Sequence, residues 1–349
     1  MEELFNISPI DGRYSSQTEP LKNYFSEAAL IKYRIIVECE YFLFLIKQKG
    51  VKIKKPSSSD IKFIKNLENP SSSEISKVKK IETEGNLNVP ATRHDVKAVE
   101  YYLKEKFSDG GLSVLSEYLH FALTSEDTNN IAYAMMLSRA LKKTILPKIR
   151  NIQKHLLKFS KEYSNSILLA RTHGQAAIPT TFGKEFKIYE NRLKTQLNRV
   201  SKIKILSKLN GAAGNYNAHM AAFPKIDWLK FSENFIESLN SEFKLNISFN
   251  KITAQIEPHD SYCELFDALS SLNMILTDMC QDIWRYISDD LLIQKAPKGE
   301  IGSSTMPHKI NPIAFENAEG NLGMANALFR HFSSKLPVSR LQRDLSDST

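Results

Sequence analysis

The sequence predicts an all-α protein with a small helical N-terminal domain over residues 1–123 and a long-helix bundle over residues 124–349. Apolar residues recur at helical spacing over four long segments, which span residues 125–157, 184–209, 261–293 and 315–332. Such segments far exceed the globular mean of about 11–12 residues per helix, and long helices are typical of bundles. Only the alternation of Leu245, Ile247 and Phe249 allows a short strand or an extended loop.

Shorter helices are predicted for the N-terminal domain. Residues 21–48 carry apolar side chains at helical spacing, which indicates one amphipathic helix. Residues 52–80 are rich in lysine and serine and predict short surface helices and loops. His94 opens a further helix, and the run from Ser108 to Gly111 ends it.

Composition excludes several classes of protein. The chain has 349 residues, 42% of them hydrophobic and 25% charged, as is typical of a soluble globular protein. Three scattered cysteines, Cys39, Cys263 and Cys280, fit neither a disulfide framework nor a metal site and are expected to be buried thiols. Without a signal-peptide pattern we expect a cytoplasmic protein that binds no membrane. The net charge of +8 comes without nucleic-acid motifs, so it favours a small polyanionic ligand over nucleic acid.

The segment 299–312 is unlike the rest of the chain. Its two glycines and two prolines exclude a regular helix or strand. Hydroxyls, an imidazole, an ammonium and an amide are crowded into it between two long apolar segments. A loop that only connects two helices does not require these reactive side chains, so we interpret the segment as an ordered or lid-like functional loop.

Residues 302–312 of this loop resemble the signature loop of the fumarase/aspartase superfamily, whose members eliminate fumarate from a succinyl group. Residues 92–100, 124–127 and 171–175 narrow the resemblance to adenylosuccinate lyases of the bacterial type. The likeness extends from Ser8 to the last residue. One departure is local, because Ala176 stands where that family usually has proline.

The resemblance implies a five-helix bundle in each subunit and a homotetramer whose active sites are shared between subunits. Four of the five bundle helices are expected within this chain. The fifth helix and a C-terminal domain would follow Thr349, so we expect the chain to be C-terminally truncated.

The function implied by the resemblance is that of a carbon–nitrogen lyase in purine nucleotide biosynthesis. It would release fumarate by β-elimination from adenylosuccinate, giving AMP, and from the succinylated aminoimidazole carboxamide ribotide (SAICAR), giving AICAR. Neither a cofactor nor a metal is required. The alternatives are another lyase of the superfamily, such as argininosuccinate lyase or fumarase, an inactive fragment, and a non-catalytic helical assembly protein. Arg13, Tyr14 and residues 92–95 favour a nucleotide substrate over a small acid.

β-Elimination needs a base for the carbon-bound proton and an acid for the departing amine. His173 is the predicted general acid, because an imidazole exchanges protons near neutrality. For the base, chemistry alone favours a histidine such as His308, since a serine is a poor base. The resemblance instead implies Ser303, whose alkoxide Lys309 and loop N–H groups would stabilise. It also implies that Glu316 orients His173.

The substrate carries a phosphate and two carboxylates, so its site must be rich in positive groups. Thr124 and Ser125 open a long helix, with Asp127 completing a capping box, and the N–H groups and dipole of such a helix start favour a carboxylate. The resemblance implies that His94 is a catalytic residue and lies at or near the substrate phosphate. The other residues that the resemblance implies in substrate binding are Arg13, Tyr14, Arg93, Asp95, Gln255, Ser304, Lys309, Asn311, Asn317, Arg343 and Ser348.

Overall fold

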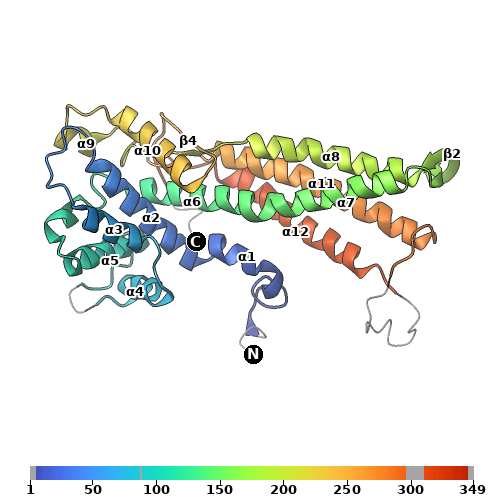
Figure 1. The fold of residues 1–349 in the computed structure, drawn as a ribbon, viewed down its shortest axis with the longest axis horizontal. Coiled ribbons are helices and arrows are strands. Elements are labelled where there is room, and N and C mark those ends of the chain that lie inside the picture. The colour runs from blue at the N-terminus through green and yellow to red at the C-terminus, as the bar shows by residue number, and fades with distance from the viewer. Residues whose placement is uncertain (1–4, 87–88, 296–309, 345–349) are drawn as a thin grey trace. The chain divides into compact units, whose positions relative to one another are not determined.

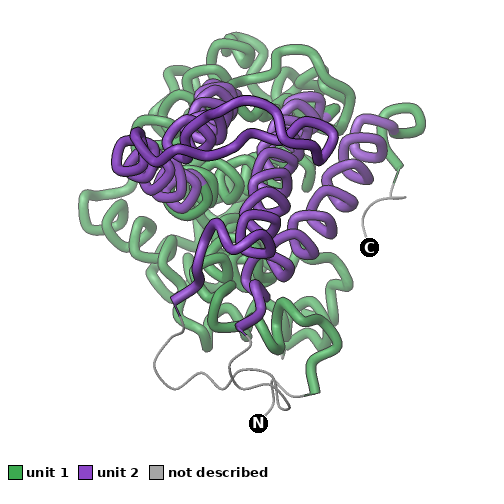
Figure 2. Tube along the Cα trace, turned by 90° about the vertical axis from the view of Figure 1, so that its right-hand side faces the viewer, with its two compact units in different colours: residues 1–145, 204–258, 339–349 green, residues 146–203, 259–338 purple. Residues whose placement is uncertain are grey.

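A computed structural model describes residues 5–86, 89–295 and 310–344 of the protein. Helices make up most of it, which confirms the all-α prediction (Figure 1). The chain divides into two compact units (Figure 2): unit 1 comprises residues 1–145, 204–258 and 339–349, and unit 2 comprises residues 146–203 and 259–338. The predicted domain boundary at residue 123 stays a prediction.

Unit 1 contains short helices and one pair of parallel strands, β3 and β4. Its elements are α1 (Ser15–Phe25), α2 (Glu27–Leu45), α3 (Ser58–Leu67), α4 (Ser72–Thr83), α5 (Asp95–Asp109), a 3-10 helix (Ser113–Tyr118), α6 (Ser125–Ala140), a π-helical turn (Leu141–Ile145), β3 (Ile205–Ser207), α9 (Asn217–Ala222), α10 (Trp228–Phe243) and β4 (Ile247–Phe249).

Two expectations for this unit need correction. The single helix predicted over residues 21–48 is two helices, because Ser26 adopts an extended conformation and its hydroxyl accepts the Ala29 N–H as the cap of α2. The helix predicted over residues 184–209 ends at Lys202, because Ile205–Ser207 pairs with Ile247–Phe249 as a strand. The short strand allowed near Ile247 is confirmed.

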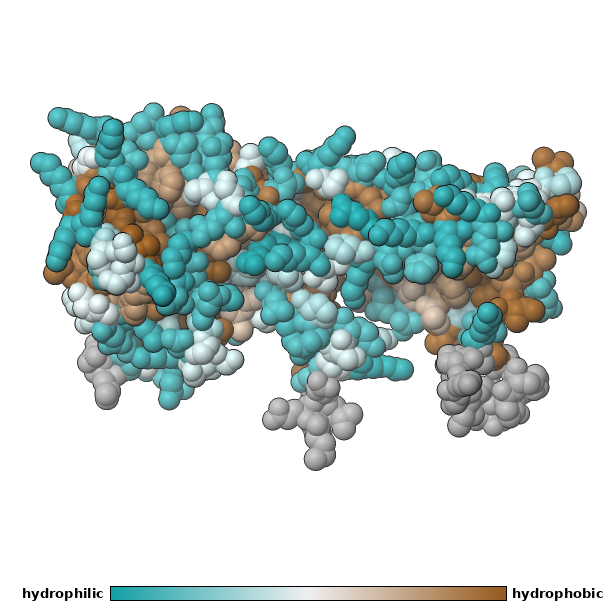
Figure 3. Space-filling model, viewed as in Figure 1, coloured by the Kyte–Doolittle hydropathy of each residue, from teal (hydrophilic) through white to brown (hydrophobic). Residues whose placement is uncertain are grey.

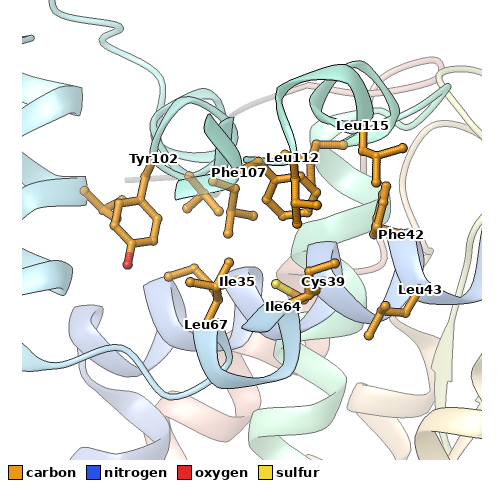
Figure 4. Close-up of a cluster of buried hydrophobic side chains, with 14 of the residues drawn as sticks. Ile35, Cys39, Phe42, Leu43, Ile64, Leu67, Tyr102, Phe107, Leu112 and Leu115 are labelled. Atoms are coloured by element: carbon orange, nitrogen blue, oxygen red, sulfur yellow. The ribbon is translucent and has the colours of Figure 1, made fainter. Parts of the chain in front are cut away.

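Helix α2 lies at the centre of unit 1. Every residue from Tyr33 to Leu43 is buried, as expected of a helix that is packed on all sides. Part of it belongs to a hydrophobic cluster shared with α3, α4 and α5 (Figure 4), in which the Phe42 and Phe107 rings meet edge to face at 5.1 Å. Its buried charged side chains, Arg34, Glu38 and Glu40, therefore need partners within the fold.

Three carboxylates of unit 1 surround one ammonium. Oxygens of Glu40, Glu68 and Glu242 lie within 4.8 Å of one another. The Lys65 ammonium contacts Glu40 directly and lies 2.5 Å from Glu242 and 3.3 Å from Glu68. One cation therefore offsets three neighbouring acids, so one acid is expected to hold its proton.

Replacing Glu68 by glutamine should remove part of the pH dependence of stability. Burial, followed by the neighbouring Glu40 carboxylate, raises the pKa of Glu68 to about 8. A carboxyl with a raised pKa in the folded state stabilises the fold below its ordinary pKa of about 4, and this contribution is lost as the pH rises to about 8. Between pH 5 and 8.5 the parental free energy of unfolding should therefore fall by roughly 2 kcal/mol more than that of Glu68→Gln.

Thermal or urea unfolding followed by circular dichroism at both pH values measures this difference. Glu84→Gln is the matched control, because the Glu84 side chain is exposed and its Lys80 partner lies 3.9 Å away. Parallel pH profiles for the parent and Glu68→Gln would contradict the prediction.

Unit 2 consists of long helices and one hairpin. Its elements are α7 (Leu146–Glu162), β1 (Ile167–Thr172), β2 (Gln175–Thr181), α8 (Phe182–Lys202), α11 (Asp260–Ser288) and α12 (Ile313–Lys335). Helix α8 packs against α7 and α11, and α11 packs against α12 (Figure 1). The antiparallel hairpin β1–β2, with strands of six and seven residues, was not predicted from the sequence.

Unit 2 exposes apolar side chains in two places. Helix α12 has no buried residue, and Met324, Leu328 and Phe332 are exposed along it. Ile167 and Ile178 of the hairpin are 80% and 72% exposed, and the hydrophobic colour at the hairpin end in Figure 3 marks this region. Apolar surface of this extent is typical of a contact surface.

The burial of the three cysteines agrees only in part with the prediction of buried thiols. Cys39 and Cys280 are buried, whereas Cys263 is half-buried. The Cys263 thiol donates to the Ser333 carbonyl at 3.4 Å.

None of the helices in the described ranges combines the length and the apolar character that crossing a lipid bilayer requires.

Candidate active site

His173 lies at the tip of the β1–β2 hairpin. Thr172 pairs with Gln175, which leaves His173 and Gly174 as a two-residue turn. Both have positive φ, 54° and 77°, as a type I′ turn requires. The Arg171 guanidinium donates to the Gly174 carbonyl at 3.3 Å across this turn. The hairpin therefore presents an exposed imidazole on a short, hydrogen-bonded support.

Three candidate residues lie at the start of α12. Glu316 accepts a hydrogen bond from the Trp284 indole at 3.0 Å. Asn317 accepts from the Asn321 amide at 3.1 Å, and Asn311 is exposed just before the helix. Among the contacts within the described part of the chain, none joins Glu316 to His173. The expected orienting role of Glu316 stays a prediction.

In unit 1, the start of α6 has the predicted capping box. The Thr124 N–H donates to the Asp127 carboxylate at 2.9 Å, and the Thr124 side chain accepts from the Asp127 N–H. Thr124 and Ser125 are half-buried, whereas Asp127 is fully buried. The positive end of the helix dipole thus lies at a partly accessible pair of hydroxyl residues, an arrangement that suits an anion.

A buried ion pair that was not predicted from the sequence lies beneath this helix start. The Lys208 ammonium is 2.8 Å from the Asp127 carboxylate, and both side chains are completely buried. The same carboxylate accepts the backbone N–H groups of Asn210 and Gly211 at 3.0 and 3.2 Å. Asp127 was recognised as a cap from its local spacing, but nothing in the sequence pointed to Lys208 as its partner.

A second buried carboxylate supports the segment that leads into α6. Glu38 of α2 accepts from the His120 ring at 2.7 Å and from the His120 N–H at 3.1 Å. It also accepts from the Thr128 hydroxyl at 2.7 Å. Burial alone would lower the pKa of His120, but the Glu38 carboxylate outweighs burial and raises it. This pair was also missed, because its members are 82 residues apart.

Gln255 and Arg343 are brought together in unit 1. The Arg343 guanidinium donates to the Gln255 side-chain oxygen at 3.1 Å, and the Gln255 amide donates to the Ala212 carbonyl at 2.9 Å. Ala212 follows the two residues whose N–H groups bind Asp127. Backbone and side-chain hydrogen bonds therefore connect the start of α6, the loop at 210–212, Gln255 and Arg343.

The start of α5 carries three adjacent candidates. His94 caps the helix through its Nδ1, which accepts the Lys97 N–H at 3.3 Å, so the proton of the neutral ring is on Nε2. Arg93 is exposed and has a φ of 48°, an uncommon conformation for a residue other than glycine. Asp95 pairs with the buried Arg34 at 2.5 Å. Burial alone would raise the pKa of Asp95, but the Arg34 charge outweighs burial and lowers it.

The remaining candidates divide into two groups. Arg13 is exposed and Tyr14 half-buried immediately before α1. Ser303, Ser304, Lys309 and Ser348 lie outside the described residues, so the roles expected for them stay predictions.

Comparisons with known proteins show to which family the chain belongs. A model of the lyase family matches residues 12–326. The adenylosuccinate lyase of Vibrio cholerae serotype O1 is 46% identical over 100% of this chain and 75% of its own length. The relatives of that name from Buchnera aphidicola subsp. Schizaphis graminum and Escherichia coli K12 are 49% and 45% identical, again over the whole chain and 74% of their own lengths. The chain belongs to the adenylosuccinate lyase family.

Solved structures agree with this family at the level of the fold. A 3-carboxy-cis,cis-muconate lactonizing enzyme from Pseudomonas putida aligns over 94% of this chain and 68% of its own, with a TM-score of 0.68 and 19% identity. A fumarate lyase from Mesorhizobium sp. BNC1 also gives 0.68, at 15% identity, over 93% of this chain and 67% of its own. At such identities the likeness shows the fold alone.

Proposed function

We propose that the protein is an adenylosuccinate lyase, which breaks adenylosuccinate into AMP and fumarate and SAICAR into AICAR and fumarate. The observation that carries this proposal is the 45–49% identity to adenylosuccinate lyases over essentially the whole chain. The arrangement of the candidate residues adds support, because an exposed imidazole and an anion-suited helix start are parts that such an elimination uses.

In this mechanism His173 is the general acid. During elimination the bond between the purine amine and the succinyl carbon breaks, and the amine leaves as a neutral group only if it gains a proton. The imidazole is exposed on a two-residue turn, so it is accessible to a ligand. His173 delivers the proton to the departing nitrogen.

Ser303 removes the proton from the carbon next to a carboxylate, which leaves a doubly charged aci-carboxylate. Lys309 and N–H groups of the same loop stabilise the serine alkoxide and the developing charge. Ser304 also contacts the succinyl group. These assignments rest on the likeness of residues 302–312 to the signature loop of the superfamily.

Unit 1 supplies groups for binding. The start of α6 with Thr124 and Ser125 holds a substrate carboxylate through its N–H groups and hydroxyls. Arg93 and His94 at the start of α5 bind the phosphate. The other binding residues of unit 1 are Arg13, Tyr14, Asp95, Gln255, Arg343 and Ser348, and unit 2 adds Asn311 and Asn317.

The protein acts as a cytoplasmic homotetramer with active sites shared between subunits. The exposed apolar residues along α12 support association, since a single chain leaves them in water. Glu316 contacts Trp284 and not His173 within the described part of one chain, which fits an orienting Glu316 that belongs to another subunit. Most soluble oligomers are symmetric homo-oligomers, so each active site would receive its Glu316 in the same way.

The test of the proposed function is to incubate the purified protein with adenylosuccinate and follow the ultraviolet change as AMP forms. We expect AMP and fumarate in equal amounts by chromatography, and AICAR and fumarate from SAICAR. The His173→Ala protein serves as the control for a contaminating lyase. Intact substrate after prolonged incubation with folded protein would refute the proposal.

A further inference from the structure

The completely buried pair of Asp127 and Lys208 is not assigned to the chemistry of the site. The Asp127 carboxylate has four donors: the N–H groups of Thr124, Asn210 and Gly211, and the Lys208 ammonium. The ammonium in turn donates to the Gly211 carbonyl at 2.9 Å. The polar side-chain atoms of the pair thus contact each other and the backbone of two segments, and none of them reaches solvent.

The two segments held by this pair are the start of α6 and the loop at 208–212. Asn130 of α6 makes a second attachment between them, because its side chain accepts the Lys208 N–H at 2.8 Å and donates to the Lys208 carbonyl at 3.1 Å. One segment carries Thr124 and Ser125, and the other accepts the Gln255 amide through Ala212. The pair therefore sets the distance between two groups of expected binding residues.

The charge of the pair is as relevant as its geometry. The first turn of α6 holds two acidic residues, Glu126 and Asp127. Without a cation beside it, the Asp127 carboxylate would offset the positive end of the helix dipole and repel a carboxylate bound there. The Lys208 ammonium offsets the Asp127 charge from inside the fold, so this residue does not weaken the attraction of the helix start for an anion.

We propose that Asp127 and Lys208 are positioning residues for the succinyl part of the substrate. They hold Thr124 and Ser125 against the 210–212 loop, and the Lys208 ammonium offsets the Asp127 charge beneath the bound carboxylate. The inference rests on the proposed function, because it takes the Thr124–Ser125 helix start as the carboxylate site. If the pair served only folding, its substitution would weaken the binding of all ligands alike. In its positioning role, its substitution weakens the binding of fumarate more than that of AMP.

The experiment compares fumarate and AMP binding by calorimetry, and the KM for adenylosuccinate, in the full chain and its variants. In Asp127→Asn the amide group faces backbone N–H donors, so it cannot reproduce the four accepted bonds. The double variant Asp127→Asn/Lys208→Met leaves no unpaired buried charge and is expected to fold. In both variants we expect the Kd of fumarate and the KM to rise about tenfold or more, and the Kd of AMP to change less than about threefold.

Glu40→Gln is the matched control. It also neutralises a buried carboxylate paired with a lysine, but among the described residues the ion pair of Glu40 is with Lys65 of α3 and not with α6 or the 208–212 loop. We expect a lower Tm and unchanged Kd values. Circular dichroism verifies the fold of each variant.

Parental fumarate affinity in a folded double variant would overturn the inference, as would an equal loss of fumarate and AMP affinity. Failure of both Asp127 variants to fold would also overturn it, because the pair would then serve the fold. A parental protein that binds fumarate but does not turn over adenylosuccinate would refute the proposed function alone. A parental protein that binds no fumarate would overturn this inference.

Discussion

Replacing His173 by alanine should lower kcat for AMP formation by about a thousandfold or more, the scale expected when a general acid is removed. Without the imidazole the purine amine must leave unprotonated or take its proton from water. The substitution should hardly affect folding, because His173 is exposed at a turn and packs against no core residue. Its φ of 54° is maintained by the hairpin pairing on either side.

The measurement is a steady-state rate from the ultraviolet change, with helix content checked by circular dichroism. His155→Ala is a suitable control, since His155 is likewise exposed and in unit 2 but lies on the surface of α7. We expect this control to keep parental activity. Should His173→Ala keep more than about a tenth of the parental kcat, His173 is not the general acid.

Mixing two inactive variants should restore activity. Ser303→Ala is expected to be as inactive as His173→Ala, because it removes the base. If each active site takes its histidine and its serine from different subunits, equal mixing gives about one site in four with both residues intact. After the subunits are dissociated and reassembled, we therefore expect about a quarter of the parental activity.

Each variant dissociated and reassembled alone serves as the control for contaminating activity. Sedimentation of the mixture should give the mass of a tetramer. A tetramer of mixed subunits that stays inactive would contradict shared sites. Recovery of activity in a mixture whose subunits have not exchanged would also contradict shared sites.

Several features of this protein were accessible from sequence because their causes are local. The long helices follow from apolar residues at helical spacing, and α11 was predicted within a few residues of its ends, Asp260 and Ser288. The capping box of Thr124 and Asp127 needs only residues three apart. The hairpin turn at His173-Gly174 also has a local cause, in a glycine suited to positive φ. The hairpin was nevertheless not predicted from the sequence.

Other features depended on residues that are distant in the sequence. Ile205–Ser207 continues the apolar pattern of α8 and becomes a strand only because Ile247–Phe249 offers its backbone for pairing. The Arg343–Gln255 contact joins residues 88 apart, and the Asn210–Asp127 bond joins residues 83 apart. Such pairs leave no periodic signal, because nothing in the spacing of a buried lysine distinguishes it from a lysine on the surface.

The sequence by itself determined the fold class, the family likeness and the types of residue available for the chemistry. The fold class follows from patterns of hydrophobicity and capping that act over a few residues, and the family likeness follows from short motifs such as residues 302–312. Only the tertiary structure decided which charges are buried and what they contact. Lys208 is one of many lysines in the sequence, and it acquires a role only when folding removes its ammonium from water and leaves the Asp127 carboxylate and the Gly211 carbonyl as its partners.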